Sequence, residues 1–192
     1  MEKNKTNVLI ALVGESGAGK SVAGKYLEDF YGMKYLRSYT TREKRADNID
    51  DHTYVNLTQY SRIINKVAEN HSHGNWYCAT ESQCDEADVY VVDVTGLKML
   101  KENYHNKPVV AFYIETPLAT RIQRMKYRGD TTESIDERLK NDKFEFDEAL
   151  KYCDYTVNNE GDLAMTCREI MNKVEEFVTQ KGEATETVDQ NS

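Results

Sequence analysis

Residues Gly14 to Ser21, GESGAGKS, fit the pattern G-x-x-x-x-G-K-[ST] over its whole length. The backbone N–H groups of such a glycine-rich loop can surround a phosphate. An apolar run precedes the loop and a helical pattern follows it, which is the context that this motif requires. We therefore predict a nucleotide site in which Lys20 contacts the β- and γ-phosphates and Ser21 ligates Mg²⁺. The predicted nucleotide-binding residues of the loop are Gly14, Glu15, Ser16, Gly17, Ala18, Gly19, Lys20 and Ser21.

A carboxylate ends another apolar run, Val89 to Val92. Asp93 would then lie at the C-terminal edge of a buried parallel strand, where a carboxylate beside a phosphate loop can orient Mg²⁺. The alternative is that Asp93 caps the helix that follows it. Residues Asp93 to Gly96 also fit the D-x-x-G element of GTPase switches, but no N-K-x-D motif follows. A GTPase switch is therefore disfavoured.

A second group of candidate phosphate ligands follows the next short apolar run. It consists of Ser38, Arg42, Arg45 and Tyr54. Two arginines three residues apart can bind one phosphate through bidentate hydrogen bonds, and hydroxyl groups can complete the site. The alternative for each arginine is a solvated surface charge. Together the four residues predict a binding site for a second phosphorylated molecule.

These segments resemble the guanylate kinases. In that family an S-x-x-x-R-x-x-R segment, followed nine residues later by a tyrosine, grips the phosphate of the acceptor monophosphate, and the second group matches those spacings without a gap. Gly74-Asn75-Trp76-Tyr77 is similar to the family's G-N-Y-Y segment, which implies that Tyr77 binds the same phosphate. The resemblance covers roughly residues 8 to 158 and implies ATP with Mg²⁺ as the phosphoryl donor.

Residues 121 to 139 resemble the family's mobile lid. Arg124, Arg128 and Arg138 match its arginines, with one residue fewer between the last two. The resemblance implies that they are catalytic together with Lys20, because arginines that arrive on closure neutralise the transferring phosphoryl group and exclude water. The alternative is an amphipathic helix with exposed arginines. Asn158 resembles a strand-end residue that lies near the donor adenine in the family.

The base-reading positions depart from the family pattern, in which a Glu, a Ser or Thr, and an Asp read guanine. The expected Glu position holds Ala68, and a one-residue deletion would let the adjacent Glu69 serve. Cys78 and Ala79 follow Tyr77 where the family has Gly and Ser or Thr, so Thr80 is the nearest hydroxyl. The phosphate-transfer residues match more closely than the residues that choose the base.

The pattern of apolar runs and helices predicts an α/β fold in which a parallel sheet is flanked by helices, as in P-loop NTPases. We expect one domain over residues 1–181, with a disordered tail over 182–192. The core would comprise residues 7–37, 88–124 and 141–181, with a monophosphate-binding insertion over about 38–87 and a helical lid over about 125–140. Within these parts we expect a strand from Met33 to Arg37 and a helix from about Thr58 to Glu69.

Composition excludes several other functions. The net charge of −8 argues against a broad surface for nucleic acid, and no apolar run approaches the ~20 residues that span a membrane. The first residues lead directly into a strand-like run, so we expect a cytoplasmic protein. The four cysteines form no CxxC pair and are expected to be free thiols. His71, His73, Cys78 and Cys84 fit no zinc-site spacing.

The sequence therefore predicts an ATP-dependent nucleoside monophosphate kinase of the guanylate kinase type, with GMP or dGMP as the favoured acceptor and small-molecule nucleotides as its partners. Three alternatives remain open. A kinase of the same fold could act on another nucleotide or on a phosphorylated sugar, a non-catalytic guanylate kinase-like module could bind acidic or phosphorylated peptides, and a P-loop ATPase could act without an acceptor. The oligomeric state cannot be read from the sequence.

Overall fold

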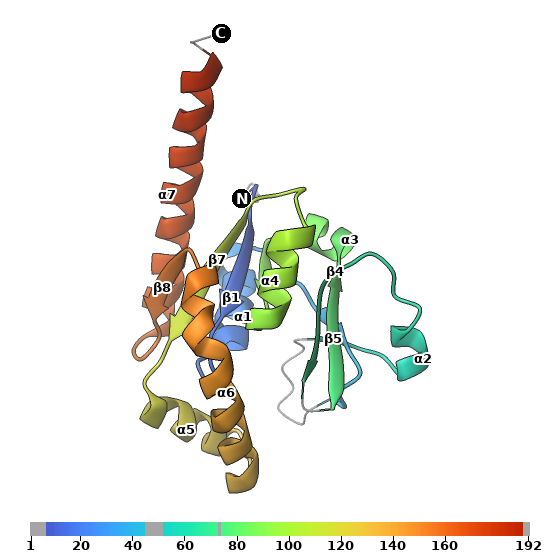
Figure 1. The fold of residues 1–192 in the computed structure, drawn as a ribbon. Coiled ribbons are helices and arrows are strands. Elements are labelled where there is room, and N and C mark those ends of the chain that lie inside the picture. Colours follow the sequence, from blue (N-terminus) through green and yellow to red (C-terminus); the bar gives the residue numbers. More distant parts are fainter. Residues whose placement is uncertain (1–6, 45–51, 73, 190–192) are drawn as a thin grey trace.

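A parallel sheet forms the centre of the molecule (Figure 1). The computed structural model describes residues 7–44, 52–72 and 74–189. The strand order is β6-β1-β7-β8, and every neighbouring pair is parallel. The strands are β1 (Leu9–Val13), β6 (Val89–Val91), β7 (Val109–Glu115) and β8 (Tyr155–Asn158). All five residues of β1 are buried, so helices cover both faces of this sheet.

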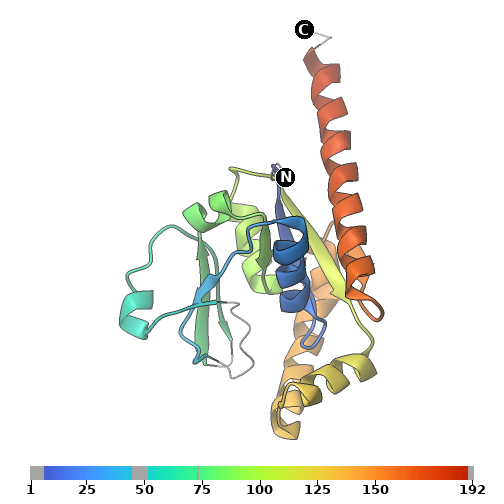
Figure 2. The ribbon, with the colours of Figure 1, turned by 180° about the vertical axis from the view of Figure 1, so that it is seen from behind.

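Alternate residues of β1 belong to two separate cores. Ile10 and Leu12 pack with Leu27 of α1 (Lys20–Tyr31) and Ile170 of α7 (Leu163–Asp189). Leu9, Ala11 and Val13 pack on the other face with α4 (Val94–Asn103) and α6 (Thr132–Tyr152). Figure 2 shows α1 and α7 on one side of the sheet, and Figure 1 shows α4 and α6 on the other. The predicted α/β class is therefore confirmed.

A second, mixed sheet carries the segment that was expected to be an insertion. Its order is β3-β2-β5-β4, with β2 parallel to β3 and antiparallel to β5. The strands are β2 (Ser38–Thr40), β3 (His52–Tyr54), β4 (Lys66–Ser72) and β5 (Asn75–Thr80). Helix α4 packs on β4 and so connects the two sheets, while α2 (Leu57–Tyr60) and α3 (Glu81–Glu86) lie beyond the strands (Figure 1).

The helix predicted from Thr58 to Glu69 is wrong. The structure has only the one-turn helix α2 there, which begins at the capping box of Asn56 and Gln59. Asn65 then takes a left-handed conformation, with φ of +54°, which breaks the helical path. The chain continues as β4, which pairs with β5. Cross-strand pairing over seven residues outweighs the helical spacing of a few apolar side chains.

The strand predicted from Met33 to Arg37 is also wrong. Only Tyr35 makes an isolated bridge, with Val89, and the regular strand begins at Ser38. The side chain of Asp88 accepts a hydrogen bond from the Lys34 amide at 2.8 Å, and the Asp88 amide donates to the Lys34 carbonyl. The chain therefore touches the first sheet briefly before it joins the second.

The expected disordered tail is helical as far as the structure describes it. Helix α7 runs to Asp189 and extends away from the sheet in both views (Figures 1 and 2). The absence of large apolar residues removes packing partners, but elongating an existing helix requires no new nucleus. At the opposite end of the molecule from this tail, α5 (Leu118–Tyr127) and α6 form a hairpin at the end of the parallel sheet (Figure 1). None of the described helices is long and apolar enough to cross a membrane.

The four cysteines are free thiols, as predicted. Burial raises the pKa of both Cys84 and Cys167 to about 12. A zinc site is not formed by the described residues, and His73 lies outside them.

Candidate active site

The predicted phosphate loop joins β1 to α1 in the expected way. Gly17 and Gly19 have φ values of +78° and +95°, which L side chains rarely adopt. A Cβ atom at Gly17 would lie only 2.7 Å from the carbonyl oxygen of Arg121, so α5 packs directly against the loop. Helix α1 begins after Gly19 without a side-chain cap. Its first N–H groups thus keep the orientation that favours an anion.

Lys20 points back into this loop. Its Nζ donates to the carbonyl oxygens of Gly14 and, at 3.0 Å, Glu15. Desolvation lowers the pKa of Lys20 to about 8, while the negative charges of Asp142 and Asp93 act in the opposite direction. The ammonium group is thus held among loop carbonyls, with two carboxylates nearby. Binding of a phosphate would supply a closer negative charge.

Two side chains that the sequence analysis did not single out hold the loop from outside. Asp142 of α6 accepts from the Ser16 amide at 2.9 Å and from its hydroxyl at 3.1 Å. Arg121 of α5 lies 3.3 Å from Asp142 and 2.9 Å from Glu15, and it is only 5% exposed. Its Nε is buried without a hydrogen-bond partner among the described residues. The loop is therefore clamped by a buried ion-pair network.

Arg124, a predicted catalytic residue, lies beside the phosphate loop, and its partners in this structure are carbonyl groups. It donates to Ala18 at 3.3 Å and to Asn159 at 2.8 Å. The side chain of Asn159 donates to the Ala18 carbonyl at 2.8 Å and is buried. Asn159, which the sequence analysis did not single out, therefore contacts the loop, whereas its neighbour Asn158 points to the other side of the strand end.

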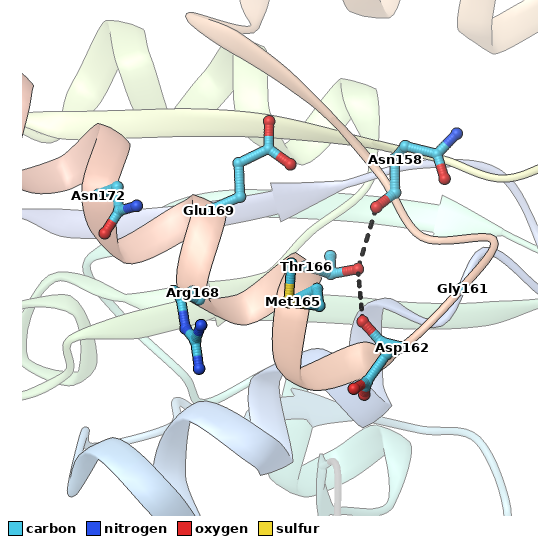
Figure 3. A pocket seen from close by; sticks show the side chains of 8 residues that line it. All are labelled: Asn158, Gly161, Asp162, Met165, Thr166, Arg168, Glu169 and Asn172. Carbon is cyan, nitrogen blue, oxygen red and sulfur yellow. Dashed lines mark hydrogen bonds between the residues drawn. The ribbon is translucent and has the colours of Figure 1, made fainter.

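Asn158 instead lines an open pocket of about 310 Å³ beside α7 (Figure 3). Its side chain accepts from the Glu160 amide, and its carbonyl accepts from the Thr166 hydroxyl at 3.0 Å. The pocket is also lined by Arg168 and Glu169 of α7, and Asn158 is the only predicted site residue among the residues that line it. The geometry gives Asn158 no contact with the phosphate loop.

The two remaining lid arginines converge on one carboxylate. Arg128 donates from Nε to Asp130 at 3.1 Å and also bonds it through its second nitrogen. Arg138 of α6 lies 3.8 Å from the same carboxylate. Two helices thus bring both guanidinium groups to a single anion. The arrangement can bind a phosphoryl group in place of Asp130.

The second sheet gathers three of the predicted acceptor residues around His52. A hydrogen bond of 2.9 Å joins the Ser38 hydroxyl to the His52 ring, which lies 6.3 Å from Tyr54 and 5.5 Å from Tyr77. His52 was missed, because no spacing distinguishes it in the sequence. Arg42 follows β2, and its amide donates to Thr40 at 3.1 Å. Arg45 lies outside the described residues.

The structure does not bring Glu69 or Thr80 to this face. Glu69 pairs with Cys78 in the register, one position away from Tyr77, and strand side chains alternate between faces. It accepts from Tyr60 at 2.9 Å and Lys66 at 2.6 Å on the back of the sheet. The Thr80 side chain accepts a hydrogen bond from the Gln83 amide and so caps α3, which engages its hydroxyl within its own segment. Both predictions of base-reading roles are therefore corrected.

Asp93 caps α4, which was the alternative interpretation. One oxygen accepts from the Gly96 amide at 2.7 Å, and the other accepts from the Asn70 side chain at 3.0 Å. Asn70 pairs with Tyr77 in the β4–β5 register, so both face the same way. The negative charge of Asp93 also opposes the lowering of the Lys20 pKa. Asp93 therefore interacts with the phosphate loop through its charge and with the face that carries Tyr77 through Asn70.

The residues near the loop fit Mg²⁺. This ion takes oxygen ligands, keeps several waters and is commonly held by one or two protein groups and substrate phosphates. The Ser21 hydroxyl makes no hydrogen bond to the described residues and stands in the first turn of α1. Asp93 has both oxygens engaged, so it fits contact with the ion through water better than direct ligation.

The chain matches no model of a known protein family. Relatives with curated names are nevertheless found over most of its length. A guanylate kinase of Helicobacter pylori is 31% identical over 171 residues, covering 82% of this chain and 81% of the relative. A guanylate kinase of Brucella melitensis is 28% identical over 170 residues, covering 81% and 77%.

A solved structure shares the fold. The guanylate kinase of Anaplasma phagocytophilum superposes with a TM-score of 0.59 at 22% identity, covering 88% of this chain and 85% of the other.

Proposed function

The chain belongs to the guanylate kinase family, and on that premise we propose that it transfers the γ-phosphoryl group of ATP to GMP or dGMP. As a member of this family it is a phosphotransferase, a nucleoside monophosphate kinase. The partners that we propose are small-molecule nucleotides. The donor phosphates would bind along the loop from Gly14 to Ser21, with Arg124 at its edge.

One observation carries the proposal. The Asp93 carboxylate accepts a hydrogen bond from Asn70, which lies opposite Tyr77, and its charge acts on the Lys20 ammonium of the phosphate loop, so Asp93 links the two parts of the site electrostatically. A P-loop enzyme without an acceptor would leave the clustering of Ser38, His52 and Tyr77 on that face without a purpose. The complete loop likewise disfavours a non-catalytic binding module.

Transfer in this site would be direct, because positioning and charge neutralisation suffice for phosphoryl transfer. Ser38, Arg42, Arg45, Tyr54 and Tyr77 would hold the acceptor phosphate. Lys20 would hold the donor phosphates, and Arg128 and Arg138 would neutralise the transferring group after exchanging Asp130 for it. Ser21, with Asp93 acting through water, would hold Mg²⁺, which would supply positive charge to the donor phosphates when bound.

We further propose that the second sheet, residues 38–87, is the monophosphate-binding part and that residues 125–140 are the lid. Figure 1 shows the second sheet beside the parallel sheet, across α4, and the hairpin of α5 and α6 at the end where β1 leads into the phosphate loop. The hairpin of α5 and α6 contacts the loop through Arg121 and Asp142. Movement of this hairpin would therefore reach the donor phosphates directly.

A second candidate is a kinase of the same fold for another nucleotide. The observation that favours it is the position of Glu69, which is held on the back of the sheet by Tyr60 and Lys66. Ala79 stands where a hydroxyl is expected in the family. The base is therefore read here by other groups.

Two variants separate the proposed roles. Lys20→Ala should lower kcat by about 100-fold or more, since removing one charge-stabilising group costs this much in comparable sites. Arg42→Ala should mainly raise the KM of the acceptor, by about 10- to 100-fold, because it removes charged hydrogen bonds to the acceptor phosphate. Exposed Arg62→Ala is the matched control. Small and equal effects of Lys20→Ala and Arg42→Ala would contradict the assignment.

A further inference from the structure

We propose that Asn70 reads the acceptor base, and that it pairs with the N1–H and O6 edge of a 6-oxopurine while leaving the 2-amino group of guanine unread. The inference rests on the proposed function, since it concerns the base of the same acceptor. It assigns the specificity of this site to a carboxamide. It also widens the acceptor class from guanine to hypoxanthine nucleotides.

Asn70 occupies the position on the second sheet from which a base can be reached. In the β4–β5 register it lies directly opposite Tyr77, and Ala68 lies opposite Ala79. Side chains directly opposite each other in an antiparallel pair project from the same face. Asn70 therefore shares the face of the proposed phosphate ligands, whereas the neighbouring Glu69 projects from the back.

The orientation of the Asn70 amide follows from its partner. An ionised carboxylate only accepts hydrogen bonds, so the nitrogen of Asn70 must face Asp93, at 3.0 Å. Asp93 is itself held by the Gly96 amide at the start of α4. The amide therefore cannot turn over without breaking this bond. The other N–H and the oxygen Oδ1, which makes no hydrogen bond to the described residues, are left for a ligand.

A carboxamide held in this way has one donor next to one acceptor. The N1–H and O6 atoms of a 6-oxopurine present the complementary pair: Oδ1 accepts from N1–H, and the remaining N–H of Nδ2 donates to O6. Recognition of the 2-amino group would need a further acceptor beside Oδ1. The side chains that follow Asn70 toward the core on this face are those of Ala68 and Ala79, which are at most 1% exposed and contain no acceptor.

Loss of a hydrogen bond to the substrate is costly only where a buried group of the site is left unpaired. Hypoxanthine differs from guanine by the absence of the 2-amino group, so IMP should leave no group of this site unpaired. We therefore expect the kcat/KM values of GMP and IMP to agree within about fivefold. AMP presents a different edge and should be used at least about 100-fold less well.

The test measures ADP formation with GMP, IMP, AMP, CMP and dTMP for three proteins: the parent, Asn70→Ala and Glu69→Gln. Asn70→Ala should lower kcat/KM for GMP and IMP alike by about 10- to 100-fold, through the acceptor KM, because two hydrogen bonds are lost. The KM of ATP should not change. Glu69→Gln, on the adjacent residue of the opposite face, should leave the GMP-to-IMP ratio as it was.

The outcomes separate this inference from the proposed function. Discrimination of GMP over IMP by more than about 50-fold, or a larger effect of Glu69→Gln than of Asn70→Ala, would overturn the inference and keep the kinase. Preference for AMP, CMP or dTMP would overturn the 6-oxopurine assignment in the same way. Activity with none of the five acceptors would overturn the proposed function itself. The melting temperature and the ADP affinity of Asn70→Ala are measured as well. Parent-like values show that the variant is folded and that its lower activity comes from lost recognition of the base.

Discussion

Replacing Asp142 by alanine should destabilise the protein strongly, although the residue lies on α6 and not on the second sheet, which carries the predicted acceptor residues. Its carboxylate accepts two hydrogen bonds from Ser16 and pairs with Arg121 at 3.3 Å. The side chains of Asp142 and Arg121 are only 10% and 6% exposed. Removing one partner of a buried pair typically costs about 3–5 kcal/mol. Arg121 keeps Glu15 at 2.9 Å, so we expect the lower end, about 3 kcal/mol.

Urea unfolding followed by far-UV circular dichroism measures this loss. In a thermal unfolding experiment on a protein of this size, the same loss of about 3 kcal/mol would lower the melting temperature by about 6–12 °C. Glu148→Ala is the matched control on the same helix, because Glu148 pairs with Lys98 at the surface. Exposed ion pairs contribute little. Equal shifts of the urea midpoint in the two variants would refute the reasoning that the buried network clamps the phosphate loop.

Two further predictions concern the loop itself. The affinity for ADP in the presence of EDTA, measured by calorimetry, should decrease by up to about tenfold per pH unit above about pH 8. The reason is that the pKa of Lys20 is lowered to about 8 and only the charged form of Lys20 attracts phosphate. Constant affinity from pH 7 to 9.5 would argue against this. Gly17→Ala should abolish ADP binding in the same assay, because Gly17 has a φ of +78° and a Cβ atom there would lie 2.7 Å from the backbone oxygen of Arg121. Gly161→Ala is the control and should leave ADP binding unchanged, because the space around Gly161 is open.

The parts of the fold that local sequence determines were predicted closely. The phosphate loop lies between a strand and a helix, β1 and α1, as its motif predicts, because a complete motif leaves few alternatives. The parallel sheet flanked by helices also followed from the pattern of apolar runs, whereas the strand order β6-β1-β7-β8 was not predicted. The second sheet was harder, because its strands are short and their pairing partners lie far apart in the sequence. The stretch from Thr58 to Glu69 shows how non-local pairing overrides helical spacing.

The site residues that were missed share one property. Asp142, Arg121 and His52 act through contacts between elements that are distant in sequence, at separations that no motif records. Asn159 was missed because only the fold shows which side of the strand end faces the phosphate loop. Similarly, the choice between Glu69 and Asn70 depends on the hairpin register. A change of register by one residue exchanges the two faces.

The central claim is that this chain transfers phosphate from ATP to a nucleoside monophosphate. The most direct measurement incubates the protein with ATP, Mg²⁺ and each ribo- and deoxyribonucleoside monophosphate in turn, and quantifies both products by anion-exchange chromatography. The account predicts equal amounts of ADP and GDP with GMP, and of ADP and dGDP with dGMP. ADP formation that is the same with and without any monophosphate, and with no second diphosphate, would contradict it.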